Sequence, residues 1–330
     1  MRRLHLLLCC LAPALLACGG ASPPELRIGI NPWPGYEHFF LAQELGLYDT
    51  TLVRVRVVEL SSLSDTRRAF ERGQLDAFTG STIELLKARE LSSRRPRLIL
   101  VSDYSDGADV VLARPGIPDL RSLRGRRVGI EPGTLNLYLL ARALEGAGLA
   151  LADIELVPVD LPQMPAAFRR GAVDAVVTYP PASLDIAALP GTRTLFSSRD
   201  LPGEILGIAA IDSAFLAAEG AAVTALLRGF ERARQYALAH PVEADARMAA
   251  RERISPQAFR AALDHGMRLV ALAEQERFLG ADGVAAEVLS RTQQILVSVG
   301  ELRGPQSLDR VLAPEATAAV LGSPPRWSAP

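Results

Sequence analysis

The sequence predicts an α/β protein of two lobes, each with a parallel-type sheet flanked by helices, joined by a hinge of two crossing strands. Three observations support this fold class. The chain has 330 residues, more than one hydrophobic core usually covers, so two lobes are expected. Short apolar runs alternate with segments of helical spacing, as they do in parallel sheets covered by helices. One unit of strands and helices also occurs twice, as duplicated lobes would require.

Two pairs of matching segments carry the duplication. Residues 27–32 (Arg-Ile-Gly-Ile-Asn-Pro) recur at 127–132 as Arg-Val-Gly-Ile-Glu-Pro. Residues 69–77 recur at 167–175, where six of nine positions are identical, namely Ala, Phe, Arg, Gly, Asp and Ala. Chance similarity between short helix ends is the alternative, but two matches at nearly the same offset favour duplication.

Each unit is expected to run strand, helix, strand, helix, strand. The strands are indicated by apolar or alternating residues, and the helices by apolar residues that recur once per helical turn. In the first unit the elements are 26–31, 38–47, 52–60, 66–72 and 76–79. In the second unit they are 127–131, 137–147, 154–160, 163–170 and 174–178.

The remaining segments complete the two lobes. Further apolar strands are expected at 97–101, 108–113 and 206–211, with the hinge near 111–114 and 209–211. Helices are expected at 221–239, at 255–272 with Ser255 as N-cap and Pro256 in the first turn, and at about 281–299. These helices should pack back on the first lobe. We therefore assign 26–111 and 212–330 to lobe 1, and 112–211 to lobe 2.

Residues 1–17 have the features of an export signal. Two arginines precede the apolar run Leu4–Ala17, which is too short to span a bilayer as a stable helix. Cys18 follows, and small residues continue into a tether at 18–25. This pattern resembles a bacterial lipoprotein signal, which implies a lipidated Cys18, whereas a plain secretory signal with a chance cysteine is the alternative. No other cysteine remains for an internal disulfide.

Three further motifs show a family resemblance. They are residues 31–37 (Asn-Pro-Trp-Pro-Gly-Tyr-Glu), 103–109 (Asp-Tyr-Ser-Asp-Gly-Ala-Asp) and 128–134 (Val-Gly-Ile-Glu-Pro-Gly-Thr). Together with the lipoprotein-like start and the duplicated units, they resemble solute-binding proteins of ABC importers, in the branch that binds nitrate, taurine, alkanesulfonates and thiamine pyrimidines. The resemblance covers essentially the whole mature chain. It implies a periplasmic-binding-protein fold of the type II kind, a lipid-anchored monomer outside the cytoplasm, and permease and ATPase partners.

The ligand is expected in loops at the carboxyl ends of the strands, where two sheets would face each other across the hinge. Trp33, Tyr36, Tyr104 and Tyr179 fall in these loops, although only 5% of the chain is aromatic. Such clustering favours a wall that faces a ligand, with core packing as the alternative. Polar residues that open helices are further candidates, although ordinary helix capping would also explain them. They are Ser62, Ser81, Thr82, Gly133, Thr134 and Asn136.

The same loops carry acidic residues and essentially no arginine. The acids are Glu37, Asp103 and Asp106, with Glu131 just before one loop and Glu204 as a weaker candidate. An anion site would more often use arginine. Acids beside aromatic rings instead favour an amine, a zwitterion or a nitrogen heterocycle over nitrate or a simple sulfonate, because they offer ion pairs and cation–π contacts. Capping of turns by the two aspartates is the alternative.

Composition and motifs argue against several other functions. The chain is 49% hydrophobic and 22% charged, with a formal net charge of −1, so neither disorder nor nucleic-acid binding is expected. The four histidines lack zinc-ligand spacing, and the phosphate-loop and G-x-S-x-G patterns are absent. We therefore expect no catalytic residue, metal or cofactor. Import is the leading hypothesis, a sensing subunit for a membrane kinase or cyclase is the alternative, and an enzyme is less expected.

Overall fold

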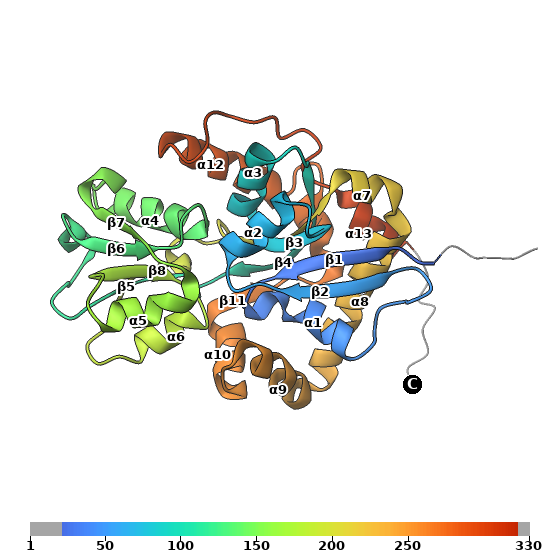
Figure 1. The fold of residues 1–330 in the computed structure, drawn as a ribbon, viewed down its shortest axis with the longest axis horizontal. Helices are drawn as coiled ribbons and strands as arrows, with labels where there is room; N and C mark the ends of the chain where they lie inside the picture. The colour runs from blue at the N-terminus through green and yellow to red at the C-terminus, as the bar shows by residue number, and fades with distance from the viewer. Residues whose placement is uncertain (1–21, 323–330) are drawn as a thin grey trace, which may run out of the picture.

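The computed structural model describes residues 22–322, which form two α/β lobes side by side (Figure 1). The sheet of lobe 1 has the strand order β11-β4-β10-β3-β1-β2, and that of lobe 2 has the order β7-β6-β8-β5-β9. The predicted two-lobed α/β fold class is confirmed. Cys18 and the expected export signal lie outside the described residues.

Lobe 1 contains the first unit and the C-terminal helices. Its strands are β1 (Glu25–Ile30), β2 (Arg54–Glu59), β3 (Ala77–Ser81), β4 (Pro96–Ser105), β10 (Leu206–Asp212) and β11 (Met267–Leu269). Its helices are α1 (Glu37–Glu44), α2 (Leu63–Glu71), α3 (Thr82–Leu91), α7 (Ser213–Ala218), α8 (Gly220–Ala239), α9 (Pro241–Glu252), α10 (Pro256–Gly266), α11 (Gln275–Leu279), α12 (Val284–Ser298) and α13 (Pro314–Leu321).

Lobe 2 contains the second unit. Its strands are β5 (Val110–Ala113), β6 (Arg127–Ile130), β7 (Glu155–Pro158), β8 (Ala175–Thr178) and β9 (Arg193–Ser197). Its helices are α4 (Leu135–Gly146), α5 (Met164–Arg169) and α6 (Ala182–Ala187). The central strands β3 and β8 are buried along their whole length, whereas the edge strands β2 and β7 are partly exposed. This burial explains why the central strands contain no charged residue, whereas β2 and β7 do.

The duplication extends to individual hydrogen bonds. The Arg27 backbone N–H and Nε both donate to Asp76 Oδ2 at 2.9 Å, and Nη2 donates to Oδ1 at 2.8 Å. In lobe 2, Arg127 makes the same three bonds to Asp174 at 3.0, 3.1 and 2.8 Å. Each pair ties the first strand of a unit to the third. The shared sequence therefore reflects a shared local structure.

The sheets are mixed rather than wholly parallel. The core strands β1, β2 and β3 are parallel to one another, as are β6, β7 and β8. By contrast, β10 runs antiparallel to β3 and β4, and β5 runs antiparallel to β8 and β9. The reason is that β5 and β10 enter their sheets from the hinge, so they start where the neighbouring core strands end.

The crossings between the lobes differ from the expected hinge positions. Strand β5 already belongs to lobe 2 at Val110, and β10 belongs to lobe 1 from Leu206 onward. The chain therefore crosses at 106–109 and at 198–205, rather than near 111–114 and 209–211. An apolar run in a sequence does not reveal which of two sheets it joins, so the expected lobe boundaries were displaced.

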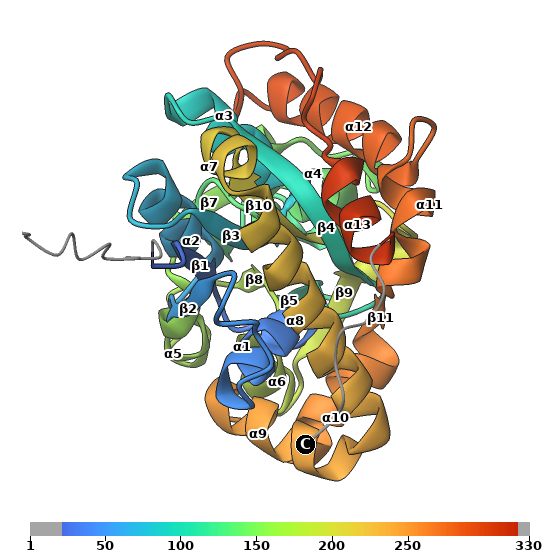
Figure 2. The ribbon, with the colours of Figure 1, turned by 90° about the vertical axis from the view of Figure 1, so that its right-hand side faces the viewer.

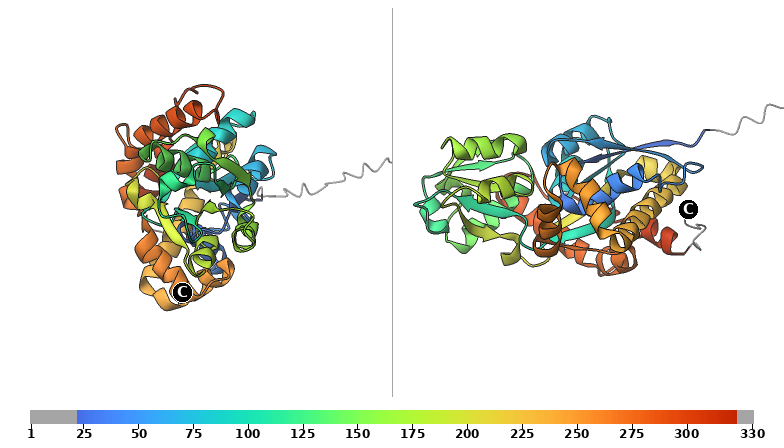
Figure 3. Two further views of the ribbon diagram at one scale, coloured as in Figure 1. Left: turned by 90° about the vertical axis from the view of Figure 1, so that its left-hand side faces the viewer. Right: turned by 90° about the horizontal axis from the view of Figure 1, so that it is seen from below.

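The C-terminal helices lie on lobe 1. Helix α8 packs against α1 and α13, and α12 packs against α3 and also contacts α4 of lobe 2 (Figure 2). Seen from below, the middle of the chain forms lobe 2, while both ends of the described chain belong to lobe 1 (Figure 3). The helix expected to reach residue 272 ends at Gly266, because the chain then pairs with β4 as strand β11.

No helix between residues 22 and 322 combines the length and the apolar character needed to cross a membrane.

Candidate functional site between the lobes

A small cavity of about 20 Å³ lies at the boundary of the two lobes. It is lined by residues that follow β1 and β8, the last residue of β3, the first residues of α2, α4 and β10, and one residue of each crossing segment. The lining residues are Asn31, Trp33, Tyr36, Leu63, Ser81, Asp109, Leu135, Tyr179, Ile205, Leu206 and Gly207. This volume accommodates about one water molecule. The lobes are therefore closed over the site.

Three aromatic residues form one wall of the cavity. The ring centroids of Trp33 and Tyr36 lie 6.2 Å apart, and the Tyr179 ring of lobe 2 meets Trp33 edge-on at 6.0 Å. The Tyr36 hydroxyl donates to the carbonyl of Gly80 at 2.6 Å. Tyr104, the fourth aromatic residue expected at the site, does not line the cavity. Its ring centroid lies 6.5 Å from that of Phe278 in α11. Both lobes thus supply aromatic surface to the site.

Asp103 holds the tryptophan in place. Its fully buried carboxylate accepts hydrogen bonds from Trp33 Nε1 at 3.1 Å and from Ser102 Oγ at 2.8 Å. Burial raises the pKa of Asp103 to about 6. A side chain at Gly35 or Gly207 would bring its Cβ within 2.1 or 2.4 Å of this carboxylate, so both positions require glycine. Asp103 therefore fixes the orientation of the Trp33 ring, although it does not itself line the cavity.

Asp109 has an unsatisfied carboxylate at the cavity. Among the described residues, neither of its buried carboxylate oxygens has a hydrogen-bond partner, and the same holds for Asn31 Oδ1 on the same cavity. Burial raises the pKa of Asp109 to about 7; the nearby Ser105 hydroxyl opposes this rise without forming a hydrogen bond of normal geometry to the carboxylate, and the negative charges of Asp103 and Glu84 add to it. A buried acceptor without a donor is costly. A ligand that donates hydrogen bonds would remove this cost.

Sequence reasoning did not select Asp109 or Asn31, although both stand in motifs that it singled out. Asp109 directly precedes β5 and Asn31 directly follows β1, so each lies next to the end of a buried strand at the lobe boundary. A polar residue at that position of an apolar run is the signal that could have identified them.

None of the five expected acidic residues lines the cavity, and three of them pair instead with arginines from other parts of the fold. Glu37 is fully buried and forms an ion pair with Arg251 of α9. Asp106 lies at the surface near Arg268 at 3.2 Å and Arg199 at 3.6 Å.

Glu204 is the third acid with arginine partners. It accepts bonds from Arg142 of α4 at 3.1 Å, from Arg291 of α12 at 2.9 Å, and from the Tyr138 hydroxyl at 2.9 Å. Glu204 thus connects lobe 2 to the C-terminal helices. Its role in the described structure is to join elements rather than to face the cavity.

Most of the expected helix-opening residues act as caps. Ser62 Oγ accepts from the Asp65 N–H at 3.2 Å, and Thr134 Oγ1 accepts from the Asn136 N–H at 3.3 Å. Asn136 Oδ1 in turn accepts from the Glu131 N–H at 3.1 Å. Of this group only Ser81, the N-cap of α3, lines the cavity.

The other two members of the group have different positions. Thr82 Oγ1 lies 3.1 Å from Thr292 Oγ1 of α12, which fastens α3 to the C-terminal helices. Gly133 has φ of +67°, so it allows the turn that leads into α4.

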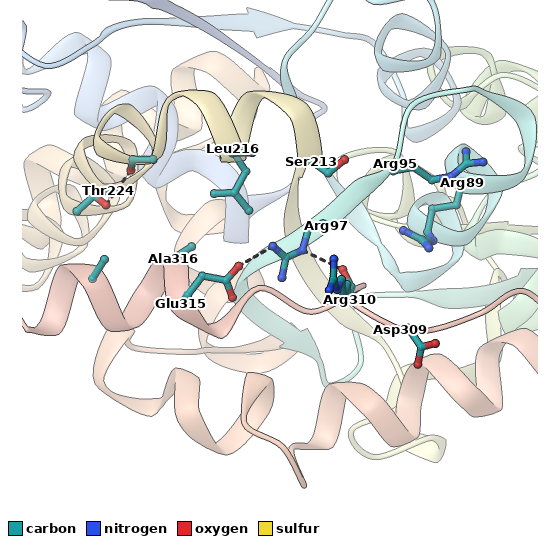
Figure 4. Close-up of a pocket in the computed structure, with 13 residues that line it drawn as sticks. Arg89, Arg95, Arg97, Ser213, Leu216, Thr224, Asp309, Arg310, Glu315 and Ala316 are labelled. Carbon is teal, nitrogen blue, oxygen red and sulfur yellow. Dashed lines mark hydrogen bonds and ion pairs between the residues drawn. The ribbon is translucent and has the colours of Figure 1, made fainter.

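A larger groove of about 630 Å³ lies on lobe 1 alone and contains four arginines (Figure 4). Among these, Arg97 donates to the carbonyls of Arg310 at 2.8 Å and Leu312 at 2.6 Å, and it pairs with Glu315. Because one lobe supplies every lining residue, closure of the hinge would not enclose a ligand there. The smaller cavity between the lobes is therefore the better candidate site.

Residues 22–322 include no group of three or more histidine, cysteine, aspartate or glutamate side chains placed to hold a metal ion.

Two α/β lobes that are joined by two crossing segments and close over a cavity between them are the features of two-lobed binding-protein folds. Residues 19–255 match the NMT1-like family, and the chain belongs to that family. A Brucella abortus (strain 2308) protein, named only as a candidate binding protein, is 26% identical over 201 residues, which are 60% of this chain and 62% of the relative. The chain thus spans less than two thirds of that relative's length. A candidate thiamine biosynthesis protein of Haemophilus influenzae is 26% identical over 64% of this chain and 68% of its own.

Solved structures share the fold. The alkanesulfonate-binding protein SsuA of Xanthomonas axonopodis pv. citri, bound to MOPS, superposes with a TM-score of 0.73 at 19% identity, over 89% of this chain and 100% of SsuA. The desulfurization enzyme DSZB superposes with a TM-score of 0.64 at 22% identity, over 90% and 99% of the two chains. The fold is therefore found in both binding proteins and an enzyme.

Proposed function

We propose that this protein is an exported solute-binding protein of an ABC importer, which captures a small organic molecule by closing two lobes over it. The observation that carries the proposal is the cavity between the lobes, where aromatic rings from both lobes surround the unsatisfied carboxylate of Asp109. Its family relatives and the SsuA structure support the same function class. Ligand binding would then shift an equilibrium between open and closed lobes through the two crossing segments.

The ligand that fits this site best is an amine, a zwitterion or a nitrogen heterocycle. Asp109 and Asn31 offer acceptors without donors, and the rings of Trp33, Tyr36 and Tyr179 offer faces and edges for a flat or cationic group. No arginine or lysine lines the cavity. The closed cavity holds about one water molecule, so an organic ligand must enter an open form and hold the lobes slightly further apart.

Export and anchoring are part of the proposal. The lipoprotein-like start supports lipidation of Cys18, which would tether a monomer to a membrane outside the cytoplasm. The partners would then be the permease and ATPase subunits of the importer. A sensing subunit for a membrane kinase or cyclase remains the alternative, since it would use the same cavity. Genes next to this one distinguish the two roles, because a permease and an ATPase favour import.

An enzymatic role has less support. DSZB shares the fold, and its studied variant replaces a cysteine. The present chain contains no cysteine after Cys18, so a thiol nucleophile would not be available in the cavity.

The proposal is tested by a thermal-shift panel of amines, amino acids, aminopyrimidines, taurine, methanesulfonate and nitrate. The protein should first be unfolded and refolded to remove any ligand carried through purification. A ligand at a hundred times its Kd adds about 2.7 kcal/mol of stability, which raises Tm by several degrees. We expect a hit among the amines, zwitterions or heterocycles.

Two matched variants test whether the ligand found in the panel binds at Asp109. Asp109→Asn should weaken its binding by about tenfold to a hundredfold, because a charged hydrogen bond is lost. Asp106→Asn, in the same crossing segment but paired at the surface, should bind like the wild type. Equal affinity in all three proteins would refute the site, and hits confined to nitrate and sulfonates would refute the ligand class.

A further inference from the structure

Three helices point their N-termini at the cavity. Leu63 begins α2, Leu135 begins α4, and Ser81 is the N-cap of α3, and all three line the cavity. An N-terminus exposes backbone N–H groups and carries the positive end of the helix dipole. Three such ends around one site would ordinarily favour an oxyanion such as a sulfonate.

Carboxylates of the protein already occupy these positions, and they do so across the boundary between the lobes. Glu131 of lobe 2 accepts from the Ser64 N–H in the first turn of α2 at 2.7 Å. Glu84 of lobe 1 accepts from the Leu135 N–H of α4 at 2.9 Å, while its second oxygen accepts from the Ser81 N–H at 2.7 Å. Both glutamates are fully buried. Each lobe thus inserts a carboxylate into a helix N-terminus next to the cavity.

Other N–H groups at these ends also have partners. At α2, the Leu63 N–H donates to the Tyr179 hydroxyl at 3.4 Å, and the Asp65 N–H donates to Ser62 Oγ. At α3, the Ile83 N–H donates to Ser81 Oγ at 3.2 Å. An entering anion would therefore have to displace an existing acceptor.

The nearest buried cations are also paired. Arg67 and Lys87 approach Gly133 beside the α4 N-terminus, but Arg67 pairs with Glu71 through Nη1, and Lys87 pairs with Glu301 at 2.7 Å. Within the described residues, the buried Nε of Arg67 has no hydrogen-bond partner, although Arg67 does not line the cavity. The unsatisfied atoms at the cavity itself are the acceptors of Asp109 and Asn31. The site is thus built to receive donors, and this observation is independent of the helix ends.

We propose that Glu84 and Glu131 determine the specificity of the site, because they fill the helix N-termini that an oxyanion would need and so exclude sulfonates, sulfate and nitrate. The inference rests on the proposed binding function and sharpens it. Because both bonds cross the lobe boundary, the same glutamates also hold the ligand-free lobes together. A neutral or cationic ligand can enter without displacing either carboxylate.

The test is a calorimetric titration of methanesulfonate into the refolded protein and three variants, in a dilute buffer free of sulfonates and amines. Glu131→Ala removes the charge and uncovers the Ser64 N–H. Glu131→Gln removes the charge but keeps a side-chain oxygen that can accept from the Ser64 N–H. This variant should therefore fold even if Glu131→Ala does not. Glu145→Ala is the matched control, because it removes the same charge from an exposed position in the same lobe. Glu84 is left unchanged, since it also caps α3.

We expect only weak methanesulfonate binding, with the same Kd, by the wild type and by Glu145→Ala. Glu131→Ala should bind at least about tenfold more tightly than the wild type, since an oxyanion gains a charged hydrogen bond and the helix dipole. Glu131→Gln should gain about threefold from the dipole alone. Tight binding by the wild type, or no gain in either Glu131 variant, would overturn the proposal. The amine panel with Asp109→Asn tests the proposed binding function separately. The proposed function and the proposed role of the glutamates can therefore fail independently of each other.

Discussion

Asp106 and Asp109 stand in the same crossing segment, yet their surroundings differ completely. Asp106 lies at the surface beside two arginines, whereas Asp109 is buried at the cavity without a hydrogen-bond partner. The sequence predicted an acidic, aromatic site from the loops, and Trp33, Tyr36, Ser81 and Tyr179 do line the cavity. It could not tell which acids would be paired, because those partners come from other elements of the fold.

The stability of the ligand-free protein should therefore depend on the protonation of Asp109. Its pKa of about 7 in the folded state lies above the ordinary value of 3.8, so the folded protein binds a proton that the unfolded chain releases. Stability should then fall as the pH rises from about 4 to 7. Asp109→Asn should reduce this dependence, leaving the part due to Asp103 with its pKa of about 6, and should exceed the wild type in stability at pH 8 by on the order of 2–4 kcal/mol.

Urea unfolding at pH 5 and pH 8 measures this difference. Asp106→Asn serves as the control and should follow the wild type at both pH values. An Asp109→Asn variant that is less stable than the wild type at pH 8 would show that Asp109 has a partner in solution.

At the scale of elements, the strands and most helices were predictable because periodicity and duplication are local signals. Contacts between distant elements were not. Helix α9 supplies Arg251 to Glu37 of α1, a pair separated by 214 residues in the chain. Glu37 reads as a loop acid in the sequence, and only the packing of α9 on α1 reveals it as part of a buried ion pair.

This ion pair should be important for the stability of lobe 1. Arg251→Met would leave the fully buried Glu37 carboxylate without its cation, which typically costs about 3–5 kcal/mol. Chemical denaturation at pH 7 measures the loss. Arg247→Met is a useful control, because Arg247 lies on the same helix and forms partly exposed pairs with Glu44 and Glu243, which contribute little. Equal losses in both variants would contradict a special role for the buried pair.

At the scale of the whole molecule, the lobes are closed over a cavity too small for an organic ligand. Bonds from Glu84 and Glu131 and the Trp33–Tyr179 contact join the two sides. The sequence predicted two lobes and a hinge, but it placed the crossings several residues too late, since each crossing strand could belong to either sheet. Where the lobes meet is a property of the assembled fold, and that is where the candidate site lies.

The most direct test of this account is a crystal structure of the protein with the strongest hit of the thermal-shift panel. We predict that a ligand nitrogen lies within hydrogen-bond distance of the Asp109 carboxylate, with Trp33, Tyr36 and Tyr179 around it and both lobes in contact. A ligand in the arginine-containing groove of lobe 1 would show that the cavity between the lobes is not the binding site. An anionic ligand group bound to the Ser64 and Leu135 N–H groups, with the glutamates displaced, would show that the ligand class is wrong.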